Sequence, residues 1–299
     1  MATHEDAITQ YIVVNDTRLA YRRLGKCDGI PLVMMIHFRG NMDFWDPALI
    51  NALAKFRPVI LIDNAGTGKS EGEIPTTFQG WAEHVIALVR ALNIRQIDLL
   101  GFSMGGGAAQ LVALNAPSLV RRLIIAGSRT SKTPNTVIGP RKIFHELAHA
   151  ATEEEFKEAL AISFFNPTAH GRAAAKTVLE RIYARKQDRA PQLPPGLAKR
   201  QTEAMTKFSI SNPENPYERI HELAMPVFVA NGDNDLLIPT VNSFELAQLL
   251  PNAHLHIFPN SGHGFLYQYA ELFAKHVNLF LDEESGGETG GNEVKARLN

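Results

Sequence analysis

The residues with the clearest chemical potential are a serine, an aspartate and a histidine that lie far apart in the chain. Ser103 stands at the centre of Gly101-Phe-Ser-Met-Gly105, a G-x-S-x-G pattern that follows the apolar run Ile97–Leu100. A serine on such a sharp strand-to-helix turn has its hydroxyl lifted clear of the sheet, and the flanking glycines relieve backbone crowding. The next backbone N–H, that of Met104, would face the space where a substrate oxygen can sit. The pattern therefore predicts Ser103 as a nucleophile with Met104 as an oxyanion donor.

A nucleophilic serine needs a base, and the base needs an acid that fixes its tautomer and stabilises its charged form. The segment Val227–Asp235 places carboxylates just beyond an apolar run, and His263 lies in the loop after the apolar run that ends at Phe258. The order serine, acid, histidine is typical of this kind of turn. Both loops follow strand candidates, and open α/β sheets carry their sites at the carboxyl ends of strands. We therefore predict that His263 is the base and that a carboxylate of the earlier loop is the acid.

The elements that must position these residues alternate between strands and helices over the first 128 residues. This alternation predicts a mainly parallel sheet built from βαβ units. Strands are expected at 11–14, 19–24, 31–37, 58–63, 97–100 and 123–126, and helices at 46–55, 78–92 and 105–114.

The alternation stops in the middle of the chain. Residues 129–218 show helical patterns alone, at 141–151, 153–165, 172–188 and 197–210, with prolines between them. Strand and helix alternation resumes at Val227 and ends with a helix from Phe265 to about Leu281. The sequence thus predicts a core of residues 1–128 and 219–281, with residues 129–218 inserted as an all-helical cap. Residues 282–299 are rich in Gly and Glu with almost no apolar residues, and are predicted to be disordered.

Several motifs together resemble those of the α/β-hydrolase superfamily. Besides the serine turn, Asp63–Ser70 is similar to the family's D-x-x-G-x-G-x-S loop, and Gly262-His263 is similar to its terminal Gly-His. The resemblance covers nearly the whole chain up to about residue 281. It implies the α/β-hydrolase fold, in which a mostly parallel sheet is flanked by helices and a helical cap is inserted between strands 6 and 7.

The resemblance also implies roles for individual residues. Gly232-Asp-Asn-Asp235 resembles the family's G-x-x-D acid loop, which selects Asp235 as the acid of a triad with Ser103 and His263. His37-Phe-Arg-Gly40 resembles the loop whose backbone supplies a second oxyanion donor. The family's usual glycine after that histidine is Phe38 here. By position the second donor is the N–H of Arg39, with Phe38 as the alternative.

Among the subgroups of the family, the layout is similar to haloperoxidase-type esterases and carbon–carbon bond hydrolases. This resemblance implies a serine hydrolase that forms an acyl-enzyme from a small or medium, mainly apolar ester or lactone. Cleavage of a carbon–carbon bond on the same fold is the main alternative, and a non-catalytic ligand receptor is another. Neither a metal nor an organic cofactor is implied.

Two further motifs suggest other chemistry. His145-Glu-Leu-Ala-His149 matches H-E-x-x-H, which places two zinc ligands one helical turn apart. It lies in the predicted cap and no third ligand is evident, so we expect an amphipathic helix rather than a zinc protease site. Gly66–Ser70 is similar to the end of a phosphate-binding P-loop. Its first glycine is replaced by Asp63, whose carboxylate would repel phosphate.

Composition sets the remaining limits. The 299 residues are 45% hydrophobic and 20% charged, which is typical of a globular protein. A net charge of −1 gives no electrostatic reason to expect nucleic acid or an anionic membrane as a partner. The single cysteine, Cys27, cannot form an intramolecular disulfide, and the first ten residues lack the apolar core of a signal peptide. We therefore expect a cytoplasmic protein that acts on a small molecule, with an oligomeric state that the sequence does not specify.

Overall fold

A computed structural model describes residues 2–283 of the chain, and the tail predicted to be disordered (282–299) lies outside this range apart from its first two residues. The central element is an eight-stranded sheet in the order β1-β2-β4-β3-β5-β6-β7-β8. β1 and β2 are antiparallel to their neighbours, whereas the strands from β4 to β8 run parallel. The strands are β1 (Gln10–Val14), β2 (Thr17–Gly25), β3 (Leu32–Met35), β4 (Pro58–Ile62), β5 (Ile97–Phe102), β6 (Val120–Ala126), β7 (Val227–Gly232) and β8 (Ala253–Phe258).

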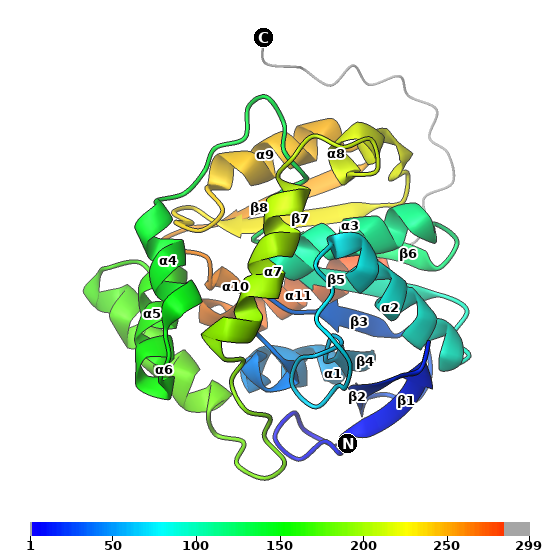
Figure 1. Ribbon diagram of the computed structural model, residues 1–299, viewed down its shortest axis with the longest axis horizontal. Helices are drawn as coiled ribbons and strands as arrows, with labels where there is room; N and C mark the ends of the chain where they lie inside the picture. The colour runs from blue at the N-terminus through cyan, green and yellow to red at the C-terminus, as the bar shows by residue number, and fades with distance from the viewer. Residues whose placement is uncertain (1, 284–299) are drawn as a thin grey trace.

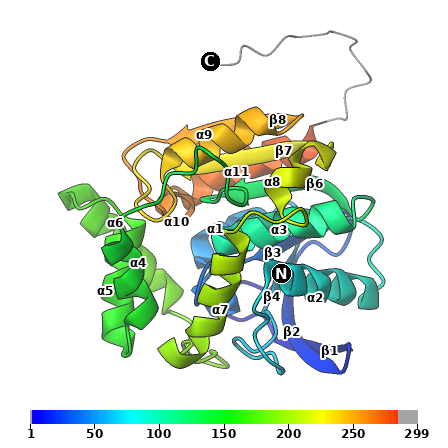
Figure 2. The same ribbon diagram turned by 45° about the horizontal axis from the view of Figure 1, so that its top comes forward.

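The inner strands are buried on both faces because helices cover the sheet on each side. Every residue of β3, β5 and β7 is buried, which explains why these strands read as continuous apolar runs rather than alternating ones. Helices α1 and α11 pack against each other, as do α2 and α3, and α9 packs on β7 and β8 (Figures 1 and 2). These helices are α1 (Pro47–Ala54), α2 (Phe78–Ala91), α3 (Met104–Asn115), α9 (Thr240–Leu249), α10 (Phe265–Gln268) and α11 (Ala270–Asp282). The predicted mostly parallel sheet flanked by helices is confirmed.

The chain between β6 and β7 is helical, as expected, and its first three helices lie at one side of the sheet (green in Figure 1). Local capping explains where two of its helices begin: the Thr152 side chain accepts from the N–H of Glu155, and Thr168 accepts from Gly171. The helices of this segment are α4 (Arg141–His149), α5 (Glu153–Phe164), α6 (Ala169–Ile182), α7 (Pro195–Phe208) and the short α8 (Pro216–Arg219). No helix within residues 2–283 is long and apolar enough to cross a membrane.

Candidate active site

Ser103 occupies a strained turn between β5 and α3. Its backbone has φ +57° and ψ −120°, a conformation that residues other than glycine rarely adopt. The two glycines of the motif are needed because of close backbone approaches. A Cβ on Gly101 would lie 2.4 Å from the carbonyl oxygen of Gly105, and one on Gly105 would lie 2.2 Å from that of Met35. The sequence thus forms a tight turn that no larger residue at these two positions could make without moving the backbone.

The aspartate and histidine predicted from the sequence come together beyond β7 and β8. Nδ1 of His263 lies 2.6 Å from Oδ2 of Asp235, and both side chains are fully buried. Because an ionised carboxylate only accepts hydrogen bonds, this contact places the ring proton on Nδ1 and leaves Nε2 as the basic nitrogen. The other carboxylate oxygen accepts from the backbone N–H groups of Leu237 at 2.8 Å and Ile238 at 2.9 Å. Asp235 is therefore fixed in orientation from both sides.

The second carboxylate of this loop has a different position. Asp233 accepts from the backbone N–H of Asn260 at 2.8 Å and of Ser261 at 3.0 Å. These bonds tie the loop after β7 to the loop that carries His263. The structure therefore brings Asp235, and not Asp233, to the imidazole.

Nε2 of His263 is buried and has no hydrogen-bond partner among residues 2–283. The ring is enclosed by Phe102 and Phe164, whose centroids lie 5.0 Å and 5.1 Å from its own. Ser103 and His263 line the same cavity, and no hydrogen bond joins their side chains within residues 2–283. Buried polar atoms are seldom left unpaired in native proteins, so an unpartnered ring nitrogen beside a cavity is a candidate functional group.

The loop after β3 carries the other residues that were predicted to stabilise an oxyanion. Nδ1 of His37 is 2.9 Å from the carbonyl oxygen of Phe38, and burial lowers the pKa of His37 to about 3. The N–H of Arg39 already donates to Oε1 of Gln201 on α7 at 2.8 Å. The N–H groups of Phe38 and Met104, in contrast, donate to no acceptor within the described part of the chain. Of the three N–H groups predicted to bind an oxyanion, those of Met104 and Phe38 thus have no acceptor within residues 2–283, whereas that of Arg39 does.

The side chain of Arg39 has a structural role that the sequence did not reveal. Its guanidinium is fully buried and donates to the carbonyl oxygens of Leu147 and Ala150 at 2.9 Å each, and to that of Leu193 at 2.6 and 3.0 Å. It also lies over the ring of Phe156, 4.6 Å from the centroid. Arg39 therefore fastens the end of α4 and the approach to α7 onto the loop after β3. In the sequence, the only indication of this role is a charged residue between Phe38 and Gly40.

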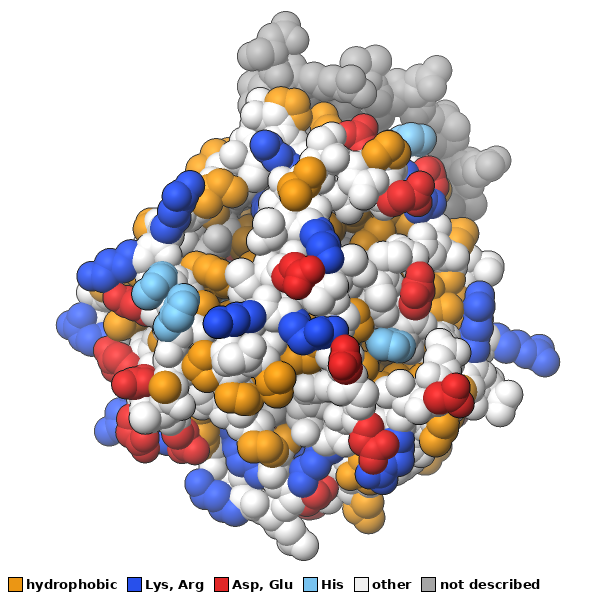
Figure 3. All heavy atoms as spheres, viewed as in Figure 1, with side chains coloured by type: hydrophobic (Ala, Val, Ile, Leu, Met, Phe, Trp, Pro, Cys, Tyr) orange, Lys and Arg blue, Asp and Glu red, His pale blue; other side chains and the backbone are white. Residues whose placement is uncertain are grey.

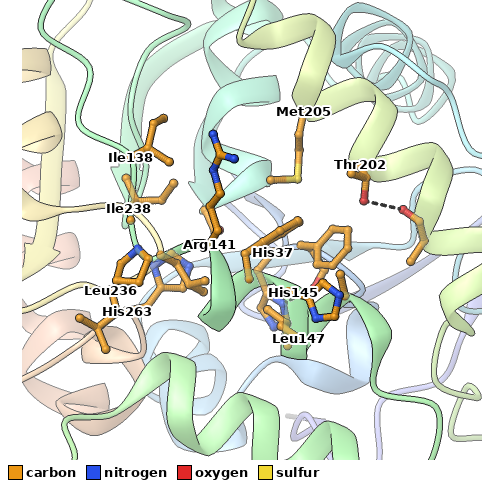
Figure 4. A pocket seen from close by; sticks show the side chains of 18 of the residues that line it. His37, Ile138, Arg141, His145, Leu147, Thr202, Met205, Leu236, Ile238 and His263 are labelled. Carbon is orange, nitrogen blue, oxygen red and sulfur yellow. Dashed lines mark hydrogen bonds between the residues drawn. The ribbon is translucent and has the colours of Figure 1, made fainter.

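A cavity of about 760 Å³ opens beside Ser103, between the sheet edge and helices α4 and α7 (Figure 4). Figure 3 shows a hollow on this face of the molecule with hydrophobic side chains around it. The lining is mainly apolar and includes Phe38, Ile138, Phe144, Leu147, Phe164, Met205, Leu236, Leu237 and Ile238, together with Ser103, His37 and His263.

The two motifs that suggested other chemistry are also placed by the structure. His145 and His149 lie on α4 at the cavity, with their rings stacked 4.1 Å apart. Among residues 2–283 no group of three or more His, Cys, Asp or Glu side chains could hold a metal ion. The loop at 66–70 wraps around Asp63, whose carboxylate accepts from the N–H groups of Met42 and Lys69. This loop is therefore organised around an internal carboxylate and not around a phosphate.

Comparisons with known proteins agree with this architecture. A family described as "alpha/beta hydrolase fold" matches residues 31–269. A 2-hydroxymuconate semialdehyde hydrolase of Pseudomonas putida is 31% identical over 236 residues, which cover 76% of this chain and 78% of that protein. A protein of Caulobacter sp. (strain K31) that is provisionally named carbamate hydrolase RutD is 27% identical over 249 residues. The match covers 82% of this chain and 88% of that protein. Among solved structures, an alpha/beta hydrolase fold protein from Chitinophaga pinensis has 36% identity and a TM-score of 0.84, covering 95% of this chain and 100% of that one.

Proposed function

Because this chain belongs to the alpha/beta hydrolase fold family, as the resemblance implied, we propose that it is a serine hydrolase with a triad of Ser103, His263 and Asp235. The observation that carries the proposal is the buried contact of 2.6 Å between Nδ1 of His263 and Asp235, while Nε2, beside the cavity that Ser103 lines, has no partner in the described part of the chain. A neutral imidazole held in this tautomer is the arrangement that a serine nucleophile needs in its base.

The chemistry follows from these positions. Nε2 of His263 takes the proton of the Ser103 hydroxyl as the oxygen attacks the substrate carbonyl carbon, and an acyl-enzyme forms when the leaving group departs with that proton. Water then attacks the acyl carbon as Nε2 of His263 takes its proton, and the Ser103 oxygen leaves with that proton as the acid product is released. Asp235 stabilises the imidazolium that forms in each step, and its two bonds from backbone N–H groups prevent it from turning away.

The N–H groups of Met104 and Phe38 are the proposed oxyanion donors. The sequence favoured Arg39 by position, but its N–H is bonded to Gln201, so Phe38, the alternative, takes this role in the proposal. Each such donor typically contributes about 3–4 kcal/mol to stabilisation of the transition state.

The substrate class is a small or medium, mainly apolar ester or lactone, and the helical segment between β6 and β7 acts as the cap that encloses it. The mainly apolar lining and the cavity of about 760 Å³ support a compound of this kind. Hydrolysis of a carbon–carbon bond is a second candidate, favoured by the 31% identity to a 2-hydroxymuconate semialdehyde hydrolase. Both reactions would use the same serine, base and acid.

Covalent labelling tests the proposal without knowledge of the substrate. We expect a fluorophosphonate to modify Ser103, as located by peptide mapping, and the Ser103→Ala variant to remain unlabelled. Ser211→Ala, which removes an exposed serine away from the cavity, is the matched control and should label as the unmodified protein does. Absence of label in a folded protein that still binds ligands would favour the receptor alternative. A panel of esters, lactones and vinylogous ketones would then separate ester from carbon–carbon bond cleavage.

A further inference from the structure

The charged residues that line the cavity are all of one sign. Arg129, Arg141 and Lys199 contribute to the lining, and no Asp or Glu does. The whole chain has 30 Lys and Arg residues against 31 Asp and Glu, so this imbalance is a property of the cavity and not of the protein. A partly enclosed, mainly apolar site with three cations concentrates anions.

None of these three cations forms an ion pair within residues 2–283. Arg141, at the start of α4, and Lys199, on α7, are exposed, and their side chains make no hydrogen bond in that range. Figure 4 shows the Arg141 side chain extending across the cavity between Ile138 and Met205. Helices α4 and α7 therefore each present to the cavity a cation that has no partner within residues 2–283.

Arg129 is the most informative of the three because it is half-buried. It follows β6, and its guanidinium donates to the carbonyl oxygen of Thr130 and to Oγ of Ser209, at 2.8 Å each. The carboxylate of Glu245 favours the charged form of Arg129, but it forms no ion pair with it within residues 2–283 and accepts from the hydroxyl of Thr133 instead. Buried charges are usually paired, and burial lowers the pKa of Arg129. A bound anion would supply the missing charge.

We propose that the cavity binds an apolar molecule that carries a carboxylate, with the carboxylate held by Arg129 and attracted by Arg141 and Lys199. A guanidinium presents a planar pair of donors that matches a carboxylate. The inference that this molecule is the substrate, with its scissile carbonyl at Ser103, rests on the proposed function, whereas the binding of the carboxylate does not.

The test compares two ligands that differ in charge and hardly in shape, hexanoate and hexanamide, by isothermal titration calorimetry on the full-length protein. We expect hexanoate to bind at least about tenfold more tightly at low ionic strength, and this preference to shrink as KCl is raised into the range where charges are screened. Arg129→Gln should abolish most of the preference. Arg95→Gln makes the same change in net charge at an exposed site outside the cavity, and should leave the preference unchanged.

Equal affinity for the two ligands, or an equal loss of preference in Arg95→Gln and Arg129→Gln, would overturn the proposal. If Arg129→Gln does not fold, the double variant R141Q/K199Q decides, because neither of these side chains makes a hydrogen bond that folding could need; it should lose roughly threefold or more of the preference. Binding is read without turnover, so a protein that discriminates hexanoate but fails to label at Ser103 would reject the proposed function while supporting the carboxylate site.

Discussion

The two walls of the cavity are built on different principles. The wall at the sheet edge holds His37 and His263, and His263 is hydrogen-bonded to Asp235; all three side chains are almost fully buried. The opposite wall, from α4 and α7, carries Arg141 and Lys199, which are exposed and unbonded within the described residues. Under the proposed function, the first wall carries the groups that react and the second influences which molecules bind. Substitutions of the buried acid and base should therefore change the rate by orders of magnitude, whereas substitutions on the helical wall should change the preference among ligands.

The largest effect is expected at the acid. Asp235→Asn would still accept from Leu237 and Ile238 but would turn an amide toward Nδ1 of His263, which favours the wrong tautomer of the ring. We expect kcat to fall by roughly 10⁴-fold with the fold intact. Steady-state hydrolysis and circular dichroism would measure both. Asp233→Asn is the matched control and should lose far less activity; comparable losses in the two variants would remove the distinction between them.

The second largest effect is expected at Arg39, which links the two walls. Arg39→Met would leave the carbonyl oxygens of Leu147, Ala150 and Leu193 without their donors in a buried site. We expect the free energy of unfolding to fall by about 3 kcal/mol, and kcat to fall with it, because the loop that carries Phe38 loses its attachment to α4. Denaturant titration and hydrolysis would measure the two quantities.

Methylguanidinium provides a control for this prediction. Arg39→Ala, a second variant at this position, leaves room for an added guanidinium. At concentrations far below those that denature the protein, methylguanidinium should restore part of the activity of Arg39→Ala and none of that of Asp235→Asn. If both the stability and kcat of Arg39→Met match those of the unmodified protein, the two walls are not coupled through this residue.

A smaller effect concerns stability against acid. Burial lowers the pKa of His37 to about 3, so the folded protein keeps this ring neutral while the unfolded chain binds a proton below its ordinary pKa of about 6.5. The unfolded state thus holds more protons between these values, and the free energy of unfolding rises with pH in that window. His37→Asn should reduce this slope by up to roughly 1.4 kcal/mol per pH unit. Denaturant midpoints of both proteins at several pH values would show it, and parallel curves would refute it.

The smallest effect is expected on the wall formed by the helices. His145→Ala and His149→Ala, alone or together, should change the rate of ester hydrolysis by no more than about twofold, the range typical of exposed substitutions. Treatment with a chelator should likewise leave hydrolysis unchanged. A loss of activity that zinc restores would instead support the H-E-x-x-H motif as a metal site.

The sequence predicted the fold well where the pattern was local. The two helices α4 and α5 were expected to begin at Arg141 and Glu153, and do so. The third was expected at 172–188 but runs from Ala169 to Ile182, because Thr168 caps an earlier turn. Asp188 lies outside it with φ +54°. A single capping hydroxyl decides where such a helix begins, and the periodic spacing of apolar residues does not reveal that hydroxyl.

The structure brings together two of the residues to which short motifs point, Asp235 and His263, whereas the catalytic roles of the three motif residues stay predictions. Short motifs identified Ser103, Asp235 and His263 because each has a distinctive neighbourhood in the chain. The contacts of Arg39 could not be found in this way, since its partners are backbone carbonyl oxygens more than a hundred residues distant. Every residue has a backbone carbonyl oxygen, so the residue types in the sequence do not indicate which residue accepts a hydrogen bond from Arg39.

The bonds from Leu237 and Ile238 to Asp235 have a consequence for how this protein can diverge. Both are donated by the backbone, while the side chains of the same two residues line the cavity. The cavity wall can therefore be re-shaped by exchanging these side chains without disturbing the carboxylate that faces His263. Proline is the exception, because it has no N–H to donate. In this loop the backbone holds the carboxylate and the side chains shape the cavity, so substitutions can change the shape of the cavity while Asp235 stays in place.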